Sequence, residues 1–252
     1  MRIDLPGAAH TPQLLALWKS VFGEYGSFWE MFLETVFSPE RCRCILDGEQ
    51  IAASLCWLNA EYRGQRIAYI YAVVTNPAYR GQGLCRRLMD DTHRHLAELG
   101  YHTALLVPAA EGLREMYRKM GYRDCTTVSE FSCEAASAPV CLRAIGPAEY
   151  TRLRRNYLPE GGVVQEEENL TFLARQAEFF TGEDFLLAAY REDDALYGME
   201  LLGNVLSAPG ILAALNCING DFRAPGEEKP FAMCSPLLEG AVIPSYFGFA
   251  FD

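Results

Sequence analysis

The chain has 252 residues, of which half are apolar and 22% are charged, and its formal net charge is −11. This composition excludes an intrinsically disordered chain, and no apolar run approaches the roughly 20 residues that cross a bilayer. Residues 140–252 hold 8 basic and 17 acidic side chains, a net charge of −9. The sequence therefore does not indicate a nucleic-acid binder, which needs clustered Lys and Arg.

The nine cysteines and four histidines show no pattern of a metal site. No two cysteines form a CxxC pair, Cys42 and Cys44 being the closest two, and the histidines do not combine with them at zinc-finger spacing. The N-terminus has an early Asp4 and no long apolar run, unlike a signal peptide. We therefore expect a cytoplasmic protein with reduced thiols, no metal and no membrane segment.

In the first half of the chain, apolar spacing predicts alternating helices and strands. Helices are predicted over 11–22, 28–37, 83–98 and 111–120, and strands over 43–46, 51–62, 66–75, 103–107 and 122–133. Thr11-Pro12 marks the start of the first helix, while Gly100 and Gly121 mark the ends of the last two. These patterns predict an α+β fold with a mixed sheet.

The segment 135–139 has the composition of a linker, so we place a boundary there, between domains 1–134 and 140–252. Strands are then predicted over 140–144, 184–191, 195–202 and 243–250, and helices over 147–157, 166–180 and 208–217. The order strand–helix–helix–strand–strand repeats the start of the first half. We therefore predict that the second domain is a degenerate copy of the first.

The most informative segment runs from Val73 to Cys85 and joins a predicted strand to a predicted helix. The N-terminus of a helix offers unpaired N–H groups and the positive end of the helix dipole, which together bind anions such as pyrophosphate. Gly81 and Gly83 allow unusual dihedral angles and a close approach of the backbone to a ligand. The segment therefore predicts a phosphate-binding turn.

This turn resembles the acetyl-CoA motif of the GNAT superfamily of N-acetyltransferases, [Arg/Gln]-x-x-Gly-x-[Gly/Ala], commonly preceded by Pro-x-Tyr. Pro77, Tyr79, Arg80 and Gly83 stand at the corresponding positions, while Cys85 replaces the final Gly or Ala and is still small. The resemblance implies a GNAT fold with a splayed central mixed sheet, and acetyl-CoA as co-substrate. The residues it assigns to the coenzyme are Val73, Val74, Arg80, Gly81, Gln82, Gly83, Leu84 and Cys85. The two valines would act through their backbone, as an added strand does.

The resemblance continues over residues 117–122, which match the family's Tyr-x-Lys-x-Gly-Phe with Tyr122 for the last Phe. In the family the first Tyr often lies near the coenzyme sulfur and protonates the leaving thiolate, so this role falls on Tyr117. A phenol with a pKa near 10 stays protonated until a thiolate with a pKa of about 8.5 departs. The alternative is a packing tyrosine, and Ala110 stands where the family frequently has a supporting Asn.

The general base is less well indicated. Many family members carry a Glu on the strand before the turn, but residues 66–74 contain no carboxylate. Tyr69 and Tyr71 are the polar candidates on that strand, Glu61 lies just upstream, and an ordered water could also take the proton.

The first predicted helix resembles that of a GNAT subset in which a second, degenerate GNAT-like domain follows the first. The mycobacterial Eis-type acetyltransferases are the best-known members, and in them a C-terminal carboxylate reaches the active site. The resemblance makes Asp252 a second catalytic candidate, with a solvent-exposed strand end as the alternative. In the family the first two helices often cover the acceptor pocket, where Glu24 and Glu30 among aromatic residues could attract a cationic amine; core packing is the alternative for most of the aromatics.

Together these features predict an N-acetyltransferase that moves an acetyl group from acetyl-CoA to a primary amine of a small molecule or peptide, by direct attack in a ternary complex. The alternatives are an acyl-CoA-binding sensor or regulatory module, or a scaffold with a vestigial nucleotide site. The second half does not repeat the Arg80–Gly83 turn, so we expect one coenzyme site per chain. Nothing in the sequence indicates the acceptor or the oligomeric state.

Overall fold

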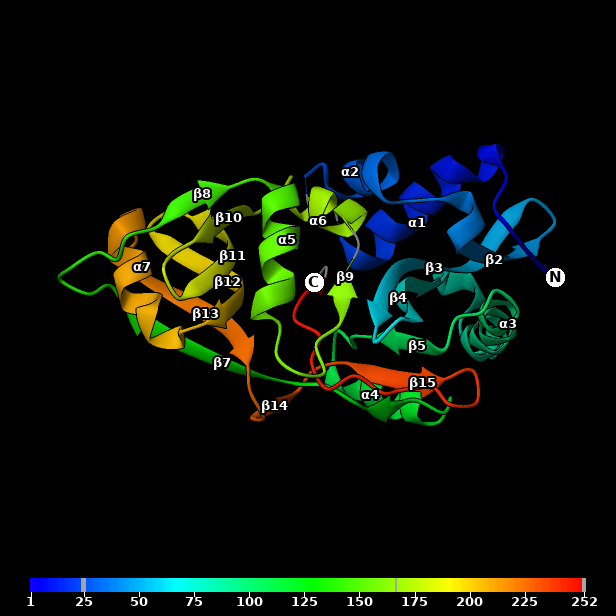
Figure 1. Cartoon of the computed structure of the whole chain (residues 1–252). Coiled ribbons are helices and arrows are strands. Elements are labelled where there is room, and N and C mark those ends of the chain that lie inside the picture. Colours follow the sequence, from blue (N-terminus) through cyan, green and yellow to red (C-terminus); the bar gives the residue numbers. More distant parts are fainter. Residues whose placement is uncertain (24–25, 166, 251–252) are drawn as a thin grey trace. The chain divides into compact units, whose positions relative to one another are not determined.

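The computed structural model describes residues 1–23, 26–165 and 167–250. The chain forms two compact units whose sequences interleave (Figure 1). Unit 1 contains Met1–Arg123 and Met233–Val242, and unit 2 contains Asp124–Ala232 and the described residues from Ile243 onward.

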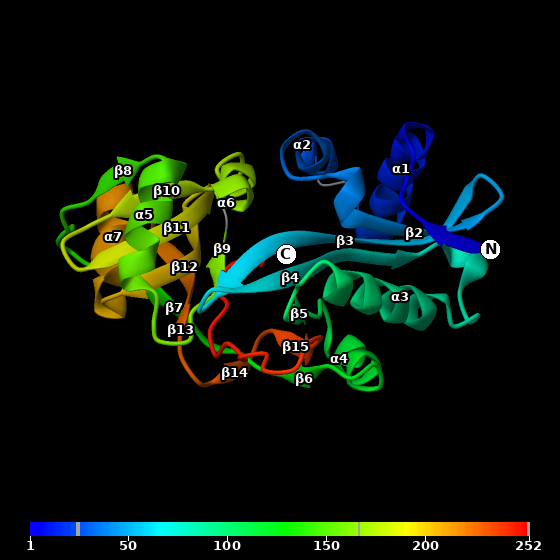
Figure 2. The same cartoon turned by 45° about the vertical axis from the view of Figure 1, so that its right-hand side comes forward.

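Unit 1 is a mixed sheet with helices on both faces. Its strands are β1 (Arg2–Asp4), β2 (Cys42–Asp47), β3 (Gln50–Tyr62), β4 (Gln65–Thr75), β5 (Thr103–Leu106), β6 (Arg123–Asp124) and β15 (Met233–Pro236), and its helices are α1 (Thr11–Phe22), α2 (Phe28–Thr35), α3 (Leu84–Glu98) and α4 (Glu111–Arg118). The strand order is β1-β2-β3-β4-β5-β15-β6. Figure 2 shows α1 and α2 on one face of this sheet and α3 and α4 on the other.

Successive side chains of a strand point to opposite faces of its sheet, so β3 packs against the helices on both faces. Ala53, Leu55 and Trp57 share a core cluster with α3, while Cys56, between them, points to the opposite face. On that opposite face Trp18 of α1 stacks near Trp29 of α2, with ring centroids 5.4 Å apart. Both faces of the central strands are therefore buried.

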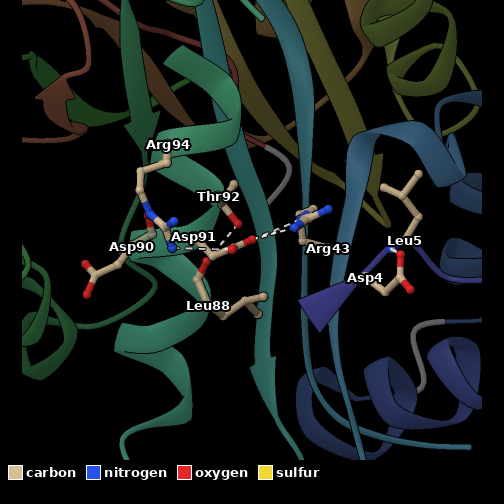
Figure 3. Close-up of polar contacts among 8 residues, drawn as sticks. All are labelled: Asp4, Leu5, Arg43, Leu88, Asp90, Asp91, Thr92 and Arg94. Atoms are coloured by element: carbon tan, nitrogen blue, oxygen red, sulfur yellow. Dashed lines mark hydrogen bonds and ion pairs between the residues drawn. The ribbon is translucent and has the colours of Figure 1, made fainter. Parts of the chain in front are cut away.

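Helix α3 is amphipathic, and its buried side chains Leu84, Leu88, Met89, Thr92 and Leu96 recur at helical spacing. An ion pair ties this helix to the sheet. Arg43 on β2 donates from Nε and Nη2 to Oδ2 of Asp91, at 3.2 and 2.6 Å, and Arg94 approaches the other oxygen (Figure 3). Both Arg43 and Asp91 are largely buried, so this pair fixes the position of α3 on the sheet.

Unit 2 repeats the element order of unit 1. It contains β7 (Thr127–Glu134), β8 (Arg143–Ile145), α5 (Pro147–Tyr157), β9 (Val164–Gln165), α6 (Glu167–Leu173), β10 (Glu178–Thr181), β11 (Phe185–Glu192), β12 (Ala195–Gly203), α7 (Ala208–Leu215), β13 (Asn219–Pro225) and β14 (Lys229–Pro230). The strand order is β14-β7-β13-β12-β11-β10-β8. As β4 and β5 do in unit 1, β12 and β13 pair in parallel. The predicted repetition of elements and the mixed α and β composition are confirmed.

A buried ion pair lies at the centre of unit 2. Arg154 of α5 donates from Nε and Nη2 to the two carboxylate oxygens of Glu200 on β12, at 2.6 and 2.8 Å, and both side chains are at most 2% exposed. The hydroxyls of Tyr150 and Tyr246 donate to the same carboxylate at 3.0 and 2.9 Å. These contacts hold the C-terminal segment, which includes Tyr246, against α5 and β12.

Each unit is built from two separate segments of the chain, whereas the predicted domains 1–134 and 140–252 were each one continuous segment. The segment predicted as one strand, 122–133, is divided: β6 belongs with the first sheet and β7 pairs with β13 in the second. The chain later returns to unit 1 as β15, which pairs with β5 (Figure 1). The division therefore falls at residues 123–124, and the segment 135–139 lies inside unit 2. Strands pair with partners that are distant in the sequence, so local composition does not predict which sheet a strand joins.

Two predictions of secondary structure were wrong. The helix predicted over 166–180 ends at Leu173 and is followed by strand β10, because the apolar residues Phe179 and Phe180 are buried as part of a sheet. The strand predicted over 243–250 is irregular, although residues 246–250 are buried. A Cβ at Gly248 would clash with the Glu200 carboxylate, so this glycine allows the close approach of an irregular segment.

All nine cysteines are reduced thiols. Over the described ranges no helix is long and apolar enough to span a membrane.

Candidate functional site

The site is built around a gap between two parallel strands of unit 1. Strand β4 pairs with β3 as far as Thr75, but its parallel ladder with β5 extends only from Ile67 to Tyr69. Past Tyr69 the two strands part, so the described ladder leaves one edge of β4 without a strand partner. Such an edge offers backbone N–H and C=O groups to an extended ligand.

A β-bulge changes the direction of β4 at this edge. Tyr71 pairs with Cys56 and Val74 with Ser54, so Ala72 and Val73 together oppose the single residue Leu55. Ala72 has a φ of +51°, in the left-handed region that L-residues other than Gly seldom adopt. Bulges of this kind are frequent beside active sites, where they redirect backbone groups. The bulge thus sets the orientation of Val73 and Val74, the two residues predicted to pair with the pantetheine arm.

The turn after β4 is preorganised. The side chain of Asn76 accepts a hydrogen bond from the N–H of Ala78 at 3.1 Å and caps the 3₁₀ helix Pro77–Tyr79. Gly81 and Gly83 then adopt φ values of +77° and +71°. A Cβ at either glycine would meet no other heavy atom within 4 Å. The glycines are therefore required for their backbone conformation and not for lack of space.

Helix α3 begins directly after Gly83, with no acidic residue in its first turn. Its first N–H groups have no partner within a helix, and three exposed arginines, Arg80, Arg86 and Arg87, lie within four residues of Gly83 along the chain. Arg86 donates to the carbonyl of Lys119 at the end of α4, and Arg87 donates to the carbonyl of Met1 at 3.2 Å. The helix dipole and the three guanidinium groups make this end of α3 attractive to a polyanion.

Tyr117 of α4 belongs to the same core cluster as Leu84, and Val73 and Cys85 pack against that cluster. The Tyr117 side chain is only 6% exposed, and its hydroxyl has no hydrogen-bond partner among the described residues. Burial, with a smaller effect of the nearby Cys85 thiol, raises the pKa of Tyr117 well above its usual value near 10. Tyr117 is therefore a neutral phenol with a free hydrogen to donate.

The structure thus places Val73, Leu84 and Cys85 in or against one core cluster with Tyr117, while Asp252 and Glu24 lie outside the described residues. Glu30 forms an ion pair with Lys19 through Oε1, while its Oε2 is buried without a hydrogen-bond partner among the described residues. Of the aromatic residues on the first two helices, Trp18, Trp29 and Phe32 are buried core residues, with Trp18 and Phe32 at 0% exposed.

A contact that the sequence analysis missed lies next to Tyr117. The ring of Tyr122 lies 5.8 Å from that of Tyr117, and its hydroxyl is 2.7 Å from Nε2 of His93 on α3. His93 was not among the residues that the sequence singled out for the site. The spacing held a usable signal, since His93 is four residues after Met89 and three before Leu96, both buried.

Comparisons with known proteins relate residues 2–125 to acetyltransferases. The sequence model of the GNAT acetyltransferase domain matches residues 2–125, and no curated protein matches the chain. A GCN5-related N-acetyltransferase from Kribbella flavida is similar in structure, with a TM-score of 0.71 and 18% identity over 92% of this chain and 70% of that one. Eis1 from Mycobacterium abscessus gives a TM-score of 0.69 and 11% identity over 94% of this chain and 73% of its own.

A tandem GNAT protein from the clavulanic acid biosynthesis pathway is also similar, with a TM-score of 0.59 and 13% identity over 95% of this chain and all of that one. At these identities the likeness concerns the fold alone. The predicted GNAT fold with a second GNAT-like region is confirmed, and family and fold together support an acyltransferase.

Proposed function

Since residues 2–125 belong to the GNAT acetyltransferase family, we propose that the protein transfers an acetyl group from acetyl-CoA to a primary amine of a small molecule or peptide, by direct attack of the amine in a ternary complex. One observation carries the proposal: the Arg80–Gly83 turn, with two glycines at positive φ, opens onto the N-terminus of α3 beside the free edge of β4.

The residues present fit acetyl-CoA at both of its chemically distinct parts. The N–H groups of the segment 81–85 and the exposed Arg80 would hold the pyrophosphate, because neither an acidic side chain nor a Cβ at the glycines opposes an anion there. The backbone of Val73 and Val74 would pair with the amide groups of the pantetheine arm. Leu84 and Cys85 pack into the cluster that contains Tyr117, so the cradle and the proposed acid share one rigid support.

Tyr117 acts as the general acid in this proposal. When the amine displaces the thiolate, Tyr117 gives its proton to the departing sulfur, which avoids a free thiolate, and the phenolate then regains a proton from water. The raised pKa of Tyr117 keeps the phenol protonated before this step.

We assign removal of the amine proton to a water molecule near Tyr71, a half-buried side chain on β4, since Gln65–Thr75 contains no carboxylate. Asp252 stays a second candidate for this role. A chain that lacks Asp252 and retains full turnover would eliminate that candidate.

Acetyl-CoA binding by thermal shift, followed by thiol release with a panel of amines, tests the proposal. We expect one equivalent of acetyl-CoA to raise the melting temperature, and thiol release with at least one primary amine but with none of the matched tertiary amines. A chain that does not bind acetyl-CoA would contradict the proposal. Binding without thiol release for any amine would instead support an acyl-CoA sensor.

A further inference from the structure

A second tyrosine, Tyr122, supports the proposed acid through its backbone. The N–H of Tyr122 donates to the carbonyl of Tyr117 at 3.1 Å, and the N–H of Met120 donates to the same carbonyl at 2.9 Å. Gly121 between them has a φ of +95°, which lets the chain reverse and close this helix end. The backbone of Tyr117 is therefore fixed by the turn that carries Tyr122.

The ring of Tyr122 also supports the ring of Tyr117. The centroids are 5.8 Å apart and the planes meet at 62°, an edge-to-face arrangement that aromatic pairs prefer. Tyr122 is only 1% exposed, so its ring has little freedom to move. Any shift of Tyr122 would pass directly to Tyr117, because the two residues are in contact through both ring and backbone.

The hydroxyl of Tyr122 is anchored outside α4, on His93 of α3, at 2.7 Å from Nε2. Burial lowers the pKa of His93, an effect that Asp90 opposes in part, and burial raises the pKa of Tyr122. A neutral phenol and a neutral imidazole face each other, so the hydrogen bond joins two uncharged groups and the imidazole tautomer sets which of them donates. His93, which anchors this hydroxyl, lies on α3, the helix whose first turn forms the proposed phosphate cradle.

From these contacts we propose that His93 and Tyr122 are positioning residues: their hydrogen bond fixes Tyr117 relative to α3 and thereby to the thioester of the bound coenzyme. The inference rests on the proposed function, because it gives a purpose to the placement of a general acid. It adds a physical link between the helix that would hold the phosphates and the helix that would deliver the proton. A misplacement of a reacting group by about 1 Å can slow catalysis by up to 100-fold.

The test compares kinetics in variants that remove one atom of the anchor. Tyr122→Phe keeps the ring and removes the hydroxyl; we expect kcat to fall by roughly fivefold with the KM for acetyl-CoA unchanged. Tyr117→Phe combined with Tyr122→Phe should be no slower than Tyr117→Phe alone, because the anchor acts only through the acid. Should Tyr122→Phe fold poorly, His93→Leu should show the same loss of kcat, while His93→Gln, whose amide oxygen accepts a hydrogen bond, should restore most of it.

Tyr101→Phe is the matched control. Tyr101 is a buried tyrosine of unit 1 whose hydroxyl contacts Trp57 and Asn59 and not α4. It should lower the melting temperature without changing kcat. Wild-type kcat in both Tyr122→Phe and His93→Leu, with Tyr117→Phe slow, would overturn the positioning role alone. Wild-type kcat in Tyr117→Phe would instead overturn the acid role in the proposed function.

Discussion

In both units an asparagine caps the 3₁₀ helix that follows the last strand before the parallel crossover. Asn76 accepts from the N–H of Ala78 in unit 1, and Asn204 accepts from the N–H of Leu206 in unit 2, each at 3.1 Å. Up to this point the two turns are built alike. The two turns differ from the residue that follows the 3₁₀ helix.

In unit 1 four residues separate the 3₁₀ helix from α3, among them the two glycines at positive φ. In unit 2 the 3₁₀ helix Val205–Ser207 runs directly into α7, whose first turn contains Pro209 and so has one N–H fewer. The carboxylate of Asp184 lies at this helix end and accepts hydrogen bonds from Asn204 at 2.7 Å and from Ser207 at 3.3 Å.

A carboxylate at the N-terminus of a helix stabilises the helix and occupies the place that an anionic ligand would need. The same fold would thus serve the proposed coenzyme binding in one unit and internal stability in the other, with a few residues at one turn deciding between them. The following variants test that distinction.

The largest effect is expected for the buried charges of unit 2. Glu200→Gln leaves the guanidinium of Arg154 buried without its counter-ion, and we expect a loss of about 3 kcal/mol in the free energy of unfolding, measured by urea denaturation. Glu149→Gln removes an exposed ion pair with Arg143 and should cost less than about 1 kcal/mol. Equal losses in the two variants would show that the buried ion pair stabilises unit 2 no more than the exposed ion pair does.

A substitution at Gly83 would give α3 the carboxylate that α7 already has. Gly83→Asp should weaken acetyl-CoA binding on the order of 100-fold, because a negative charge at the helix N-terminus repels the pyrophosphate. Gly83→Asn has nearly the same shape, tolerates a positive φ and carries no charge, so it should retain most of the affinity in a titration calorimetry experiment. Equal weakening by Asp and Asn would mean that conformation and not charge governs this turn.

Removing the hydroxyl of Tyr117 addresses chemistry rather than binding. Tyr117→Phe should lower kcat by roughly 30-fold and leave the dissociation constant of acetyl-CoA unchanged, because only the proton donor is lost. The acid works in its protonated form and its pKa lies above 10, so the wild-type kcat should not fall on the basic side until the pH exceeds about 10. A basic limb near pH 8, or a variant with wild-type turnover, would assign the proton to another group.

The smallest effect is expected at Asp184. Asp184→Asn keeps a hydrogen-bond acceptor at α7 and removes its charge, which should cost about 0.5 kcal/mol of stability. The turn would still lack the two glycines and the free N–H of residue 209, so the stoichiometry of acetyl-CoA should stay at one per chain. Two equivalents of acetyl-CoA bound in calorimetry would show that the carboxylate of Asp184 alone had prevented binding at a second site.

The turn and its helix could be predicted from sequence because local chemistry determines them. Gly81 and Gly83 adopt the positive φ values that only glycine takes readily, and Leu84 to Leu96 follow the period of a helix packed on one side. The bulge at Ala72 had no such signal, since alanine is rarely found at positive φ and the register with Leu55 imposes it there.

Features that depend on contacts between distant parts of the chain could not be predicted from the sequence either. Phe179 and Phe180 suit a helix or a strand until their partners Ala188 and Leu187 are known. Apolar residues 246–250 indicated burial correctly, but their irregular path depends on the carboxylate of Glu200, almost fifty residues earlier in the chain. His93 lay on a predictable helix face, whereas its partner Tyr122 comes from a separate helix end.

The return of β15 to unit 1 has a consequence for biosynthesis. Strand β5 ends at Leu106, but its partner β15 ends at Pro236, roughly 130 residues later. At a synthesis rate of about 5–20 residues per second, one edge of β5 waits on the order of ten seconds for that partner on the ribosome. During this time the half-built sheet presents an open edge to neighbouring nascent chains, so the demand for chaperones should last until β15, which lies in the last 20 residues of the chain, is translated.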